Sequence, residues 1–216
     1  MQRSDCWPRT NWRLAVACGA FCLVNGCGGG SPSPEPTAST GPTGAIRLNP
    51  TDVIGRTVFP IGNTASGGQG QTLLDIPCGL GSETYHIHTH LSLFVNGDQI
   101  AIPAGIGFKD PIADANGLVE DGICLYDLHT HDQTGIVHVE SAAQRDFTLG
   151  MFFALWGRPL SRVRVADFDG PVTVYVDGVL YSGEPSALVF GSLQQITLVV
   201  GARPATLPVY VLPYEN

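Results

Sequence analysis

Residues 90–103 read HLSLFVNGDQIAIP, and this stretch indicates the fold most clearly. Its apolar side chains recur at every second position, as in a strand with one buried face. Asn96-Gly97 is a dipeptide that favours a type I′ turn between two antiparallel strands. Residues 172–181, VTVYVDGVLY, repeat the pattern around Asp177-Gly178. The sequence therefore predicts short strands separated by glycine, proline and aspartate turns.

One short helix is predicted after Thr148. This threonine can cap the run LGMFFALWG at residues 149–157, and Gly157 and Pro159 end it. The aromatic side chains of the run are expected to pack against a sheet rather than to bind a ligand. The fold class predicted is mainly β or α+β: an antiparallel β-rich single domain at residues 46–216 with one short helix packed on the sheet.

The N-terminus has the features of an export signal. Three arginines precede an apolar run at residues 14–24 that is too short to span a membrane permanently. Residues 24–27, VNGC, resemble a lipobox, in which Cys27 is lipidated once a signal peptide at residues 1–26 is removed. Val24 and Asn25 depart from the usual residues of that motif, so ordinary secretion and an uncleaved anchor stay open. A lipoprotein of the bacterial cell envelope is expected, on the periplasmic side or at the cell surface.

Residues 27–45 are rich in glycine, serine and proline and predict a flexible tether. Removal of residues 1–26 takes away three arginines and one aspartate, so the formal net charge changes from −8 to −10. An acidic surface repels phosphate backbones and anionic lipids, which argues against a nucleic-acid partner. Membrane contact is expected through the lipid anchor, and a soluble cation is the partner favoured; no protein partner is indicated.

Two cysteines, Cys78 and Cys124, remain after the signal peptide and Cys27 are set aside. An even pair in an oxidising compartment predicts a disulfide. Two thiolate metal ligands are the alternative, which is weakened because the cysteines lie far apart in sequence and neither belongs to a CxxC pair.

All six histidines lie between residues 86 and 138. Residues 85–95, YHIHTHLSLFV, place His86, His88 and His90 on one face of a strand, because alternate residues of a strand point the same way. Residues 124–141, CLYDLHTHDQTGIVHVES, place a second set in the same manner. There His129 and His131 share a face, and so do His138 and Glu140.

Two such strands side by side could offer three or four imidazoles to one ion. A disulfide between the cysteines that precede the two segments would help to bring them together. The ligand set favoured is His88, His90, His129 and His131, with His86 and His138 as alternatives, because one ion cannot reach all three histidines of a single strand. Asp127, Asp132 and Glu140 are candidates to orient the rings by accepting hydrogen bonds from the ring nitrogens that do not bind the metal. A purely structural role is the alternative, above all for His138, which could be a hydrogen-bonded strand residue.

The metal predicted is one Cu(II) or Zn(II) ion, since an all-imidazole site suits both and soft sulfur ligands are scarce. Non-haem iron is a lesser alternative, held by His138, Glu140 and one further histidine. The acidic residues 110–122, DPIADANGLVEDG, lack the ligand spacing and closing glutamate of a calcium loop and predict a turn-rich surface loop. No nucleophile elbow or phosphate-binding glycine loop is present in the sequence.

Four blocks resemble an uncharacterised family of exported bacterial proteins: HIHTHLSLFVNG, IPAGIG, CLYDLHTHDQTGIVHVES and FTLGMFFALWG. The resemblance covers about residues 78–200. It implies that the histidine strands and the helix belong to one domain, and it implies neither an activity nor a particular metal.

The function predicted is capture, buffering or delivery of a divalent metal, with binding favoured over catalysis because no separate general acid or base is evident. One rival is a hydrolase- or hydratase-type metalloenzyme with three histidine ligands, an open position for water, and Glu140 or Asp132 as the base. The other rival is an interaction module in which the histidines only pair across strands.

Overall fold

The computed structural model describes residues 44–214, which lie in one compact unit. The predicted signal peptide, Cys27 and almost all of the predicted tether lie outside the described residues. The described chain is mainly β, with several mostly antiparallel sheets and one short α-helix. This confirms the fold class predicted from the sequence. None of the helices within residues 44–214 is long and apolar enough to cross a membrane.

The elements follow one another in a regular succession of short strands interrupted by one α-helix and one 3-10 helix. They are β1 (Ile46–Arg47), β2 (Cys78–Gly79), β3 (Tyr85–Val95), β4 (Asp98–Ile100), β5 (Phe108–Lys109), β6 (Ile112–Ala113), β7 (Val119–Asp121), β8 (Cys124–Tyr126), β9 (Leu128–His129), β10 (Ile136–Ser141), α1 (Leu149–Trp156), β11 (Leu160–Ser161), β12 (Arg164–Val165), β13 (Phe168–Asp169), β14 (Val172–Val176), β15 (Val179–Tyr181), the 3-10 helix η1 (Pro185–Ala187), β16 (Gln195–Val200) and β17 (Tyr210–Val211).

The largest sheet has the order β15-β14-β16-β3-β10-β9, and β4 also pairs with β3. Strand β3 has different neighbours along its length. Its first half pairs antiparallel with β10, whereas residues from His90 to Val95 pair in parallel with β16. The histidine-bearing half of β3 therefore lies beside β10, and β10 in turn pairs with β9.

The two predicted hairpins are both present. Asn96 and Gly97 have φ angles of 51° and 94° and connect β3 to β4. Asp177 and Gly178 have φ angles of 50° and 78° and connect β14 to β15. Positive φ at both central positions is what a type I′ turn requires, and the asparagine or aspartate followed by glycine accepts it at low cost.

The predicted helix is present as α1, and its ends follow the expected chemistry. The Thr148 side chain accepts a hydrogen bond from the Met151 backbone N–H, and Gly157 ends the helix in the left-handed conformation. Phe152, Phe153 and Trp156 are at most 1% exposed. They pack in the main hydrophobic core, as predicted for a helix that covers a sheet.

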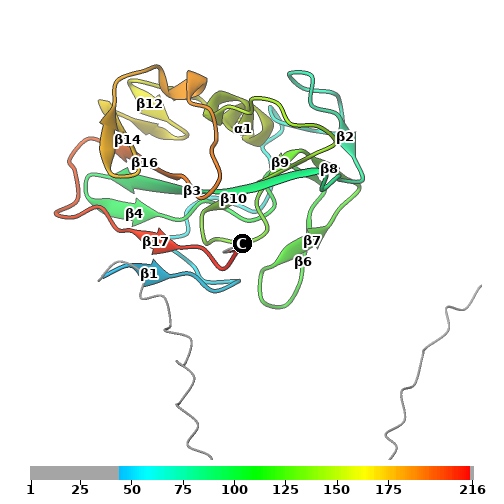
Figure 1. Cartoon of the computed structure of the whole chain (residues 1–216), viewed down its shortest axis with the longest axis horizontal. Coiled ribbons are helices and arrows are strands. Elements are labelled where there is room, and N and C mark those ends of the chain that lie inside the picture. The colour runs from blue at the N-terminus through cyan, green and yellow to red at the C-terminus, as the bar shows by residue number, and fades with distance from the viewer. Residues whose placement is uncertain (1–43, 215–216) are drawn as a thin grey trace, which may run out of the picture. The chain divides into compact units, whose positions relative to one another are not determined.

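The two faces of the β3–β10 region are covered differently. Alternate residues such as Leu91, Val137 and Val139 point into the main core with α1. The opposite face carries Ile136 and is covered by a smaller core that includes Leu48 and Tyr210. Figure 1 shows α1 on one side of β3, and β17 and β1 on the other. The histidines lie on this second face, beneath the N-terminal and C-terminal segments of the described chain.

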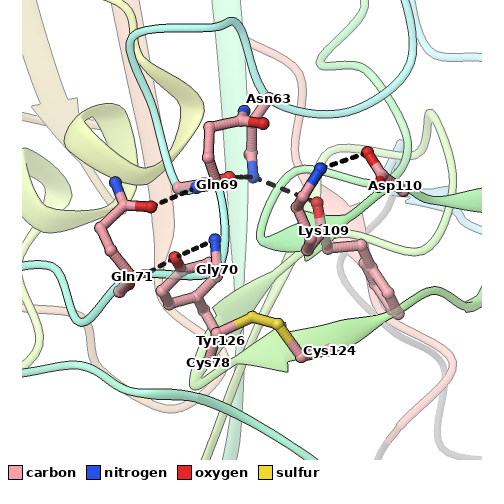
Figure 2. The surroundings of a disulfide bond; sticks show 11 residues. Asn63, Gln69, Gly70, Gln71, Cys78, Lys109, Asp110, Cys124 and Tyr126 are labelled. Carbon is pink, nitrogen blue, oxygen red and sulfur yellow. Dashed lines mark hydrogen bonds and ion pairs between the residues drawn. A yellow bond between two sulfur atoms is a disulfide. The ribbon is translucent and has the colours of Figure 1, made fainter.

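Cys78 and Cys124 form the predicted disulfide, with their Cα atoms 5.4 Å apart (Figure 2). Beside it, the Tyr126 hydroxyl donates a hydrogen bond to the Gln71 carbonyl at 2.6 Å and accepts one from the Gly70 N–H at 3.0 Å. The disulfide joins β2 to β8, so it ties together the segments that lead into β3 and β9. A disulfide indicates folding in an oxidising, extracytoplasmic compartment.

The acidic residues 110–122 form the small β6–β7 hairpin. Asp114 closes its turn, because one carboxylate oxygen accepts hydrogen bonds from the backbone N–H groups of Asn116 and Leu118 at 2.8 and 2.9 Å. This confirms the predicted turn-rich loop.

Candidate metal centre

Three neighbouring strands arrange the histidines in rows across the sheet. On one face, His88 of β3 lies opposite His138 of β10, and His138 lies opposite His129 of β9. In the adjacent row, His86 lies opposite Glu140. Residues directly opposite one another have Cβ atoms only about 4.5–5.5 Å apart. The register therefore turns a sequence pattern into a cluster of side chains.

Four side chains form a compact set of potential ligands, which we call the inner group. Their nitrogen and carboxylate oxygen atoms all lie within 4.8 Å of one another. The group consists of His129, His131, His138 and Glu140.

The distances within the inner group fit a single small cation. His129 Nε2 lies 3.2 Å from His131 Nε2 and 3.6 Å from Glu140 Oε1. His138 Nδ1 lies 3.3 Å from the same Glu140 oxygen. In a tetrahedral site with bonds of about 2.0–2.1 Å, neighbouring ligand atoms are about 3.3–3.4 Å apart. These three separations are close to the edges of such a tetrahedron, and the remaining ones are at most 4.8 Å.

Backbone carbonyls fix the orientation of two of these rings. His129 Nδ1 donates to the Tyr126 carbonyl at 3.1 Å, and His131 Nδ1 donates to the Val119 carbonyl at 2.6 Å. A carbonyl oxygen only accepts, so in each neutral ring the proton is on Nδ1. When both rings are neutral, their two Nε2 lone pairs therefore face each other. A cation placed there would satisfy both, and such support from behind is typical of metal-bound histidines.

The charge states also favour a cation. Burial lowers the pKa of His131, and it lowers the pKa of His138 to about 4, so both rings are neutral at pH 7. Burial alone raises the pKa of Glu140, but the neighbouring His129 and His138 outweigh it and hold this pKa well below its usual range. Neutral imidazoles and an ionised carboxylate are the forms that bind metal.

His86 and His88 border the inner group on the β3 side. His86 Nε2 lies 3.1 Å from Glu140 Oε1, and the His88 ring stacks on Tyr214 at a centroid distance of 4.0 Å. Burial first, and then the nearby His138 and His86, lower the pKa of His88 to about 3. Together with His138, these two histidines form a second set of potential ligands within 4.8 Å of one another. We call this set the outer group.

His90 is the one histidine that belongs to neither group. Its cross-strand partner on β10 is Ile136 rather than a histidine. Its Nε2 donates to the Thr134 carbonyl at 2.9 Å, and its ring lies 4.1 Å from that of Tyr210. Of the four ligands favoured from the sequence, the structure brings His129 and His131 into the inner group and His88 into the outer group, and places His90 apart.

Three carboxylates were expected to orient the histidine rings through hydrogen bonds, and the structure places each of them differently. Glu140 lies among the histidines themselves. Asp132 accepts hydrogen bonds from the backbone N–H groups of Thr51 and Thr134, at 2.8 and 3.0 Å, and so holds the β9–β10 turn. Burial raises the pKa of Asp127. Within residues 44–214, neither aspartate forms a hydrogen bond with a histidine.

Two tyrosines of the C-terminal segment cover the histidines, and sequence reasoning gave them no role. Tyr210 packs on His90 and Tyr214 packs on His88. They come from a part of the chain more than 110 residues away, with no periodic pattern linking them to β3. The sequence contained no signal for this contact.

Comparisons of the chain with protein-family models, curated proteins and solved structures gave no match in any of the three. The family resemblance noted from the sequence blocks thus stays an expectation, and the function must be inferred from the site itself.

Proposed function

We propose that this protein is an exported, lipid-anchored protein that binds one divalent cation, Zn(II) or Cu(II), in the inner group, and that it captures, buffers or delivers this metal. The observation that carries the proposal is the pair of Nε2 atoms of His129 and His131, which face each other at 3.2 Å while both Nδ1 atoms donate to backbone carbonyls. Two facing lone pairs repel each other, and in a buried place no water relieves this, so a proton or a metal ion between them is stabilising.

The donor set supports zinc or copper(II) over other metals. Imidazole nitrogens are borderline ligands, and three of them with one carboxylate suit Zn(II) and Cu(II). The mature cysteines are joined in a disulfide, so they offer no thiolate to a softer ion such as Cu(I). Magnesium and calcium prefer sites built from oxygen atoms.

Binding is supported over turnover by the number of ligands. Four ligand atoms fill a tetrahedral site, whereas a catalytic zinc site keeps one position open for water. Glu140 lies among the ligands, and Asp132 is engaged with the β9–β10 turn, so neither is well placed to act as a separate general base. The disulfide supports the exported location, and the lipid anchor at Cys27 rests on the sequence motif alone.

The experiment is thermal unfolding of the purified, chelator-treated protein, without metal and with Zn(II) or Cu(II). A metal that binds only the folded state stabilises it by about 2.7 kcal/mol when the free metal is one hundred times the Kd. His131→Ala should lose most of this gain. His90→Gln is the matched control, since it changes another histidine of the same sheet face, and it should keep the gain. If neither metal raises the wild-type unfolding temperature, the proposal is wrong.

A further inference from the structure

We infer that the outer group of His86, His88 and His138 is a second, solvent-facing position for the same cation, and that the metal reaches the inner group through it. This inference rests on the proposed function of the inner group and adds the route by which the metal arrives there.

The outer group has the compactness of a ligand set. One ligand atom from each of its three histidines lies within 4.8 Å of the other two. The His88 ring centroid is 4.5 Å from those of both His86 and His138. Three imidazoles at such separations can hold Zn(II) or Cu(II) and leave a coordination position for water.

An unsatisfied atom points to a ligand at this place. His88 Nε2 is buried and has no hydrogen-bond partner among the described residues. A buried polar atom without a partner costs about 1–3 kcal/mol, so such atoms are uncommon unless they have another use. A metal bound to this nitrogen would remove the cost.

Exposure decreases from the outer group to the inner group. The His86 side chain is 33% exposed, that of Glu140 12%, and that of His129 0%. An ion arriving from solvent therefore meets His86 first. His129 has no exposed surface, and an ion coming from the β3 side reaches it past His86 and Glu140, which are themselves potential ligands. His131 of the inner group is partly exposed.

One side chain belongs to both positions, and a second faces both. His138 is a member of both groups. Glu140 Oε1 lies 3.1 Å from His86 Nε2 and 3.6 Å from His129 Nε2, so one carboxylate oxygen faces both. A cation could keep His138 and Glu140 while it exchanges His86 and His88 for His129 and His131. Each exchange replaces one neutral imidazole by another, so the charge around the ion is unchanged and the ion is never stripped of protein ligands.

Sharing His138 has a consequence for stoichiometry. If both positions use this ring for the same ion, they are occupied alternately, and the wild-type protein holds one ion at a time. Removal of the inner histidines should leave the outer position intact, with weaker binding.

The test combines Zn(II) titration calorimetry with stopped-flow measurement of zinc capture from a chromophoric chelator, on the whole protein. His129→Ala/His131→Ala should still bind one Zn(II), at least about tenfold more weakly than wild type, because losing ligands costs no less than losing their supporting contacts. His86→Ala/His88→Ala should bind one Zn(II) with an affinity near that of wild type and capture it at least about tenfold more slowly. His90→Gln is the control and should match wild type in both measurements. Should the inner double variant fail to fold, His131→Gln alone takes its place.

The outcomes separate this inference from the proposed function. If the inner variant binds no zinc while wild type does, the outer position is not a site and the inner one stands. If His86→Ala/His88→Ala captures zinc as fast as wild type, the route is wrong. Two zinc ions bound at once by wild type would contradict the sharing of His138. If wild type binds no zinc or Cu(II) at all, the proposed function fails first.

Discussion

Two positions on strand β3, His90 and His88, differ in what lies opposite them, although they share one face of the sheet. His90 is opposite Ile136, donates to the Thr134 carbonyl and is covered by Tyr210. His88 is opposite His138, and its Nε2 has no hydrogen-bond partner in the part of the chain that the structure describes. Both rings are shielded by a tyrosine, so shielding does not distinguish them.

The difference is made by the neighbouring strand. His90 donates from Nε2 to a backbone carbonyl, and its other nitrogen, Nδ1, lies 3.5 Å from the Ser92 hydroxyl and not beside another imidazole. His88 lies between two other imidazoles, those of His86 and His138. A shared strand face is therefore necessary for a metal site in a sheet but not sufficient. The cross-strand partner decides whether a histidine is structural or a potential ligand. Four changes test this distinction, in order of decreasing effect.

The largest effect is expected from His138→Ala, because His138 belongs to both groups of potential ligands. At free metal one thousand times the wild-type Kd, wild type should gain about 4.1 kcal/mol of stability, and the variant should gain close to none. Thermal unfolding of chelated and metal-loaded protein measures both values. A variant that kept the full gain would show that the metal binds elsewhere.

His90→Ala should have the opposite combination of effects: a large loss of stability without metal and an unchanged stabilisation by metal. The substitution leaves the Thr134 carbonyl without its donor and a cavity beneath Tyr210, at a site only 1% exposed. The metal-free protein should lose about 3 kcal/mol of unfolding free energy. The gain from added metal should be the same as in wild type. Denaturant unfolding with and without metal measures the two effects. If added metal no longer stabilised the variant, His90 would be a ligand.

Acid should destabilise the metal-free protein, partly through His90. Burial lowers the pKa of His90 to about 4, whereas the unfolded chain has a histidine pKa near 6.5. Above pH 6.5 both states are neutral and stability is complete; as the pH falls from 6.5 towards 4, only the unfolded state takes up the proton, and stability is lost. At pH 5 this one residue should account for about 2 kcal/mol.

The lowered pKa values of His88 and His138 act in the same direction. The change in unfolding free energy between pH 7 and pH 5 should therefore be smaller by about 2 kcal/mol in His90→Gln than in wild type. Equal pH dependence in the two proteins would mean that His90 titrates normally in the folded state.

Tyr214→Ala should have the smallest effect. Its ring stacks on His88 at the edge of the cluster, where the tyrosine is partly exposed at 38%. Loss of one aromatic pair should cost about 1 kcal/mol or less of unfolding free energy, and added metal should stabilise the variant as it does wild type. Thermal unfolding with and without metal measures this. A loss as large as that from His90→Ala would mean that the C-terminal segment is part of the site and not only its cover.

Local features of the fold could be predicted because their causes are local. Asn96-Gly97 and Asp177-Gly178 specify their turns by tolerating positive φ, and Thr148 and Gly157 specify the ends of α1. The disulfide was predicted from the even pair of cysteines that remains once the expected signal peptide and Cys27 are set aside.

The candidate site could be predicted only in part, because strand register is a long-range property. The sequence indicated which histidines share a face, but not that His138 would lie between His88 and His129. Register near the β9–β10 turn depends on a close approach of the backbone at Gly135. A Cβ atom there would lie 2.5 Å from the Leu91 carbonyl oxygen. Such a contact between distant segments has no periodic signal.

The most direct measurement is anomalous X-ray diffraction at the zinc edge, from crystals of the protein grown with Zn(II). The proposed site predicts one strong peak within about 2.0–2.2 Å of nitrogen atoms of His129, His131 and His138 and of a Glu140 oxygen, with none at His90. A peak bonded to His90, or no peak among these four side chains, would contradict it.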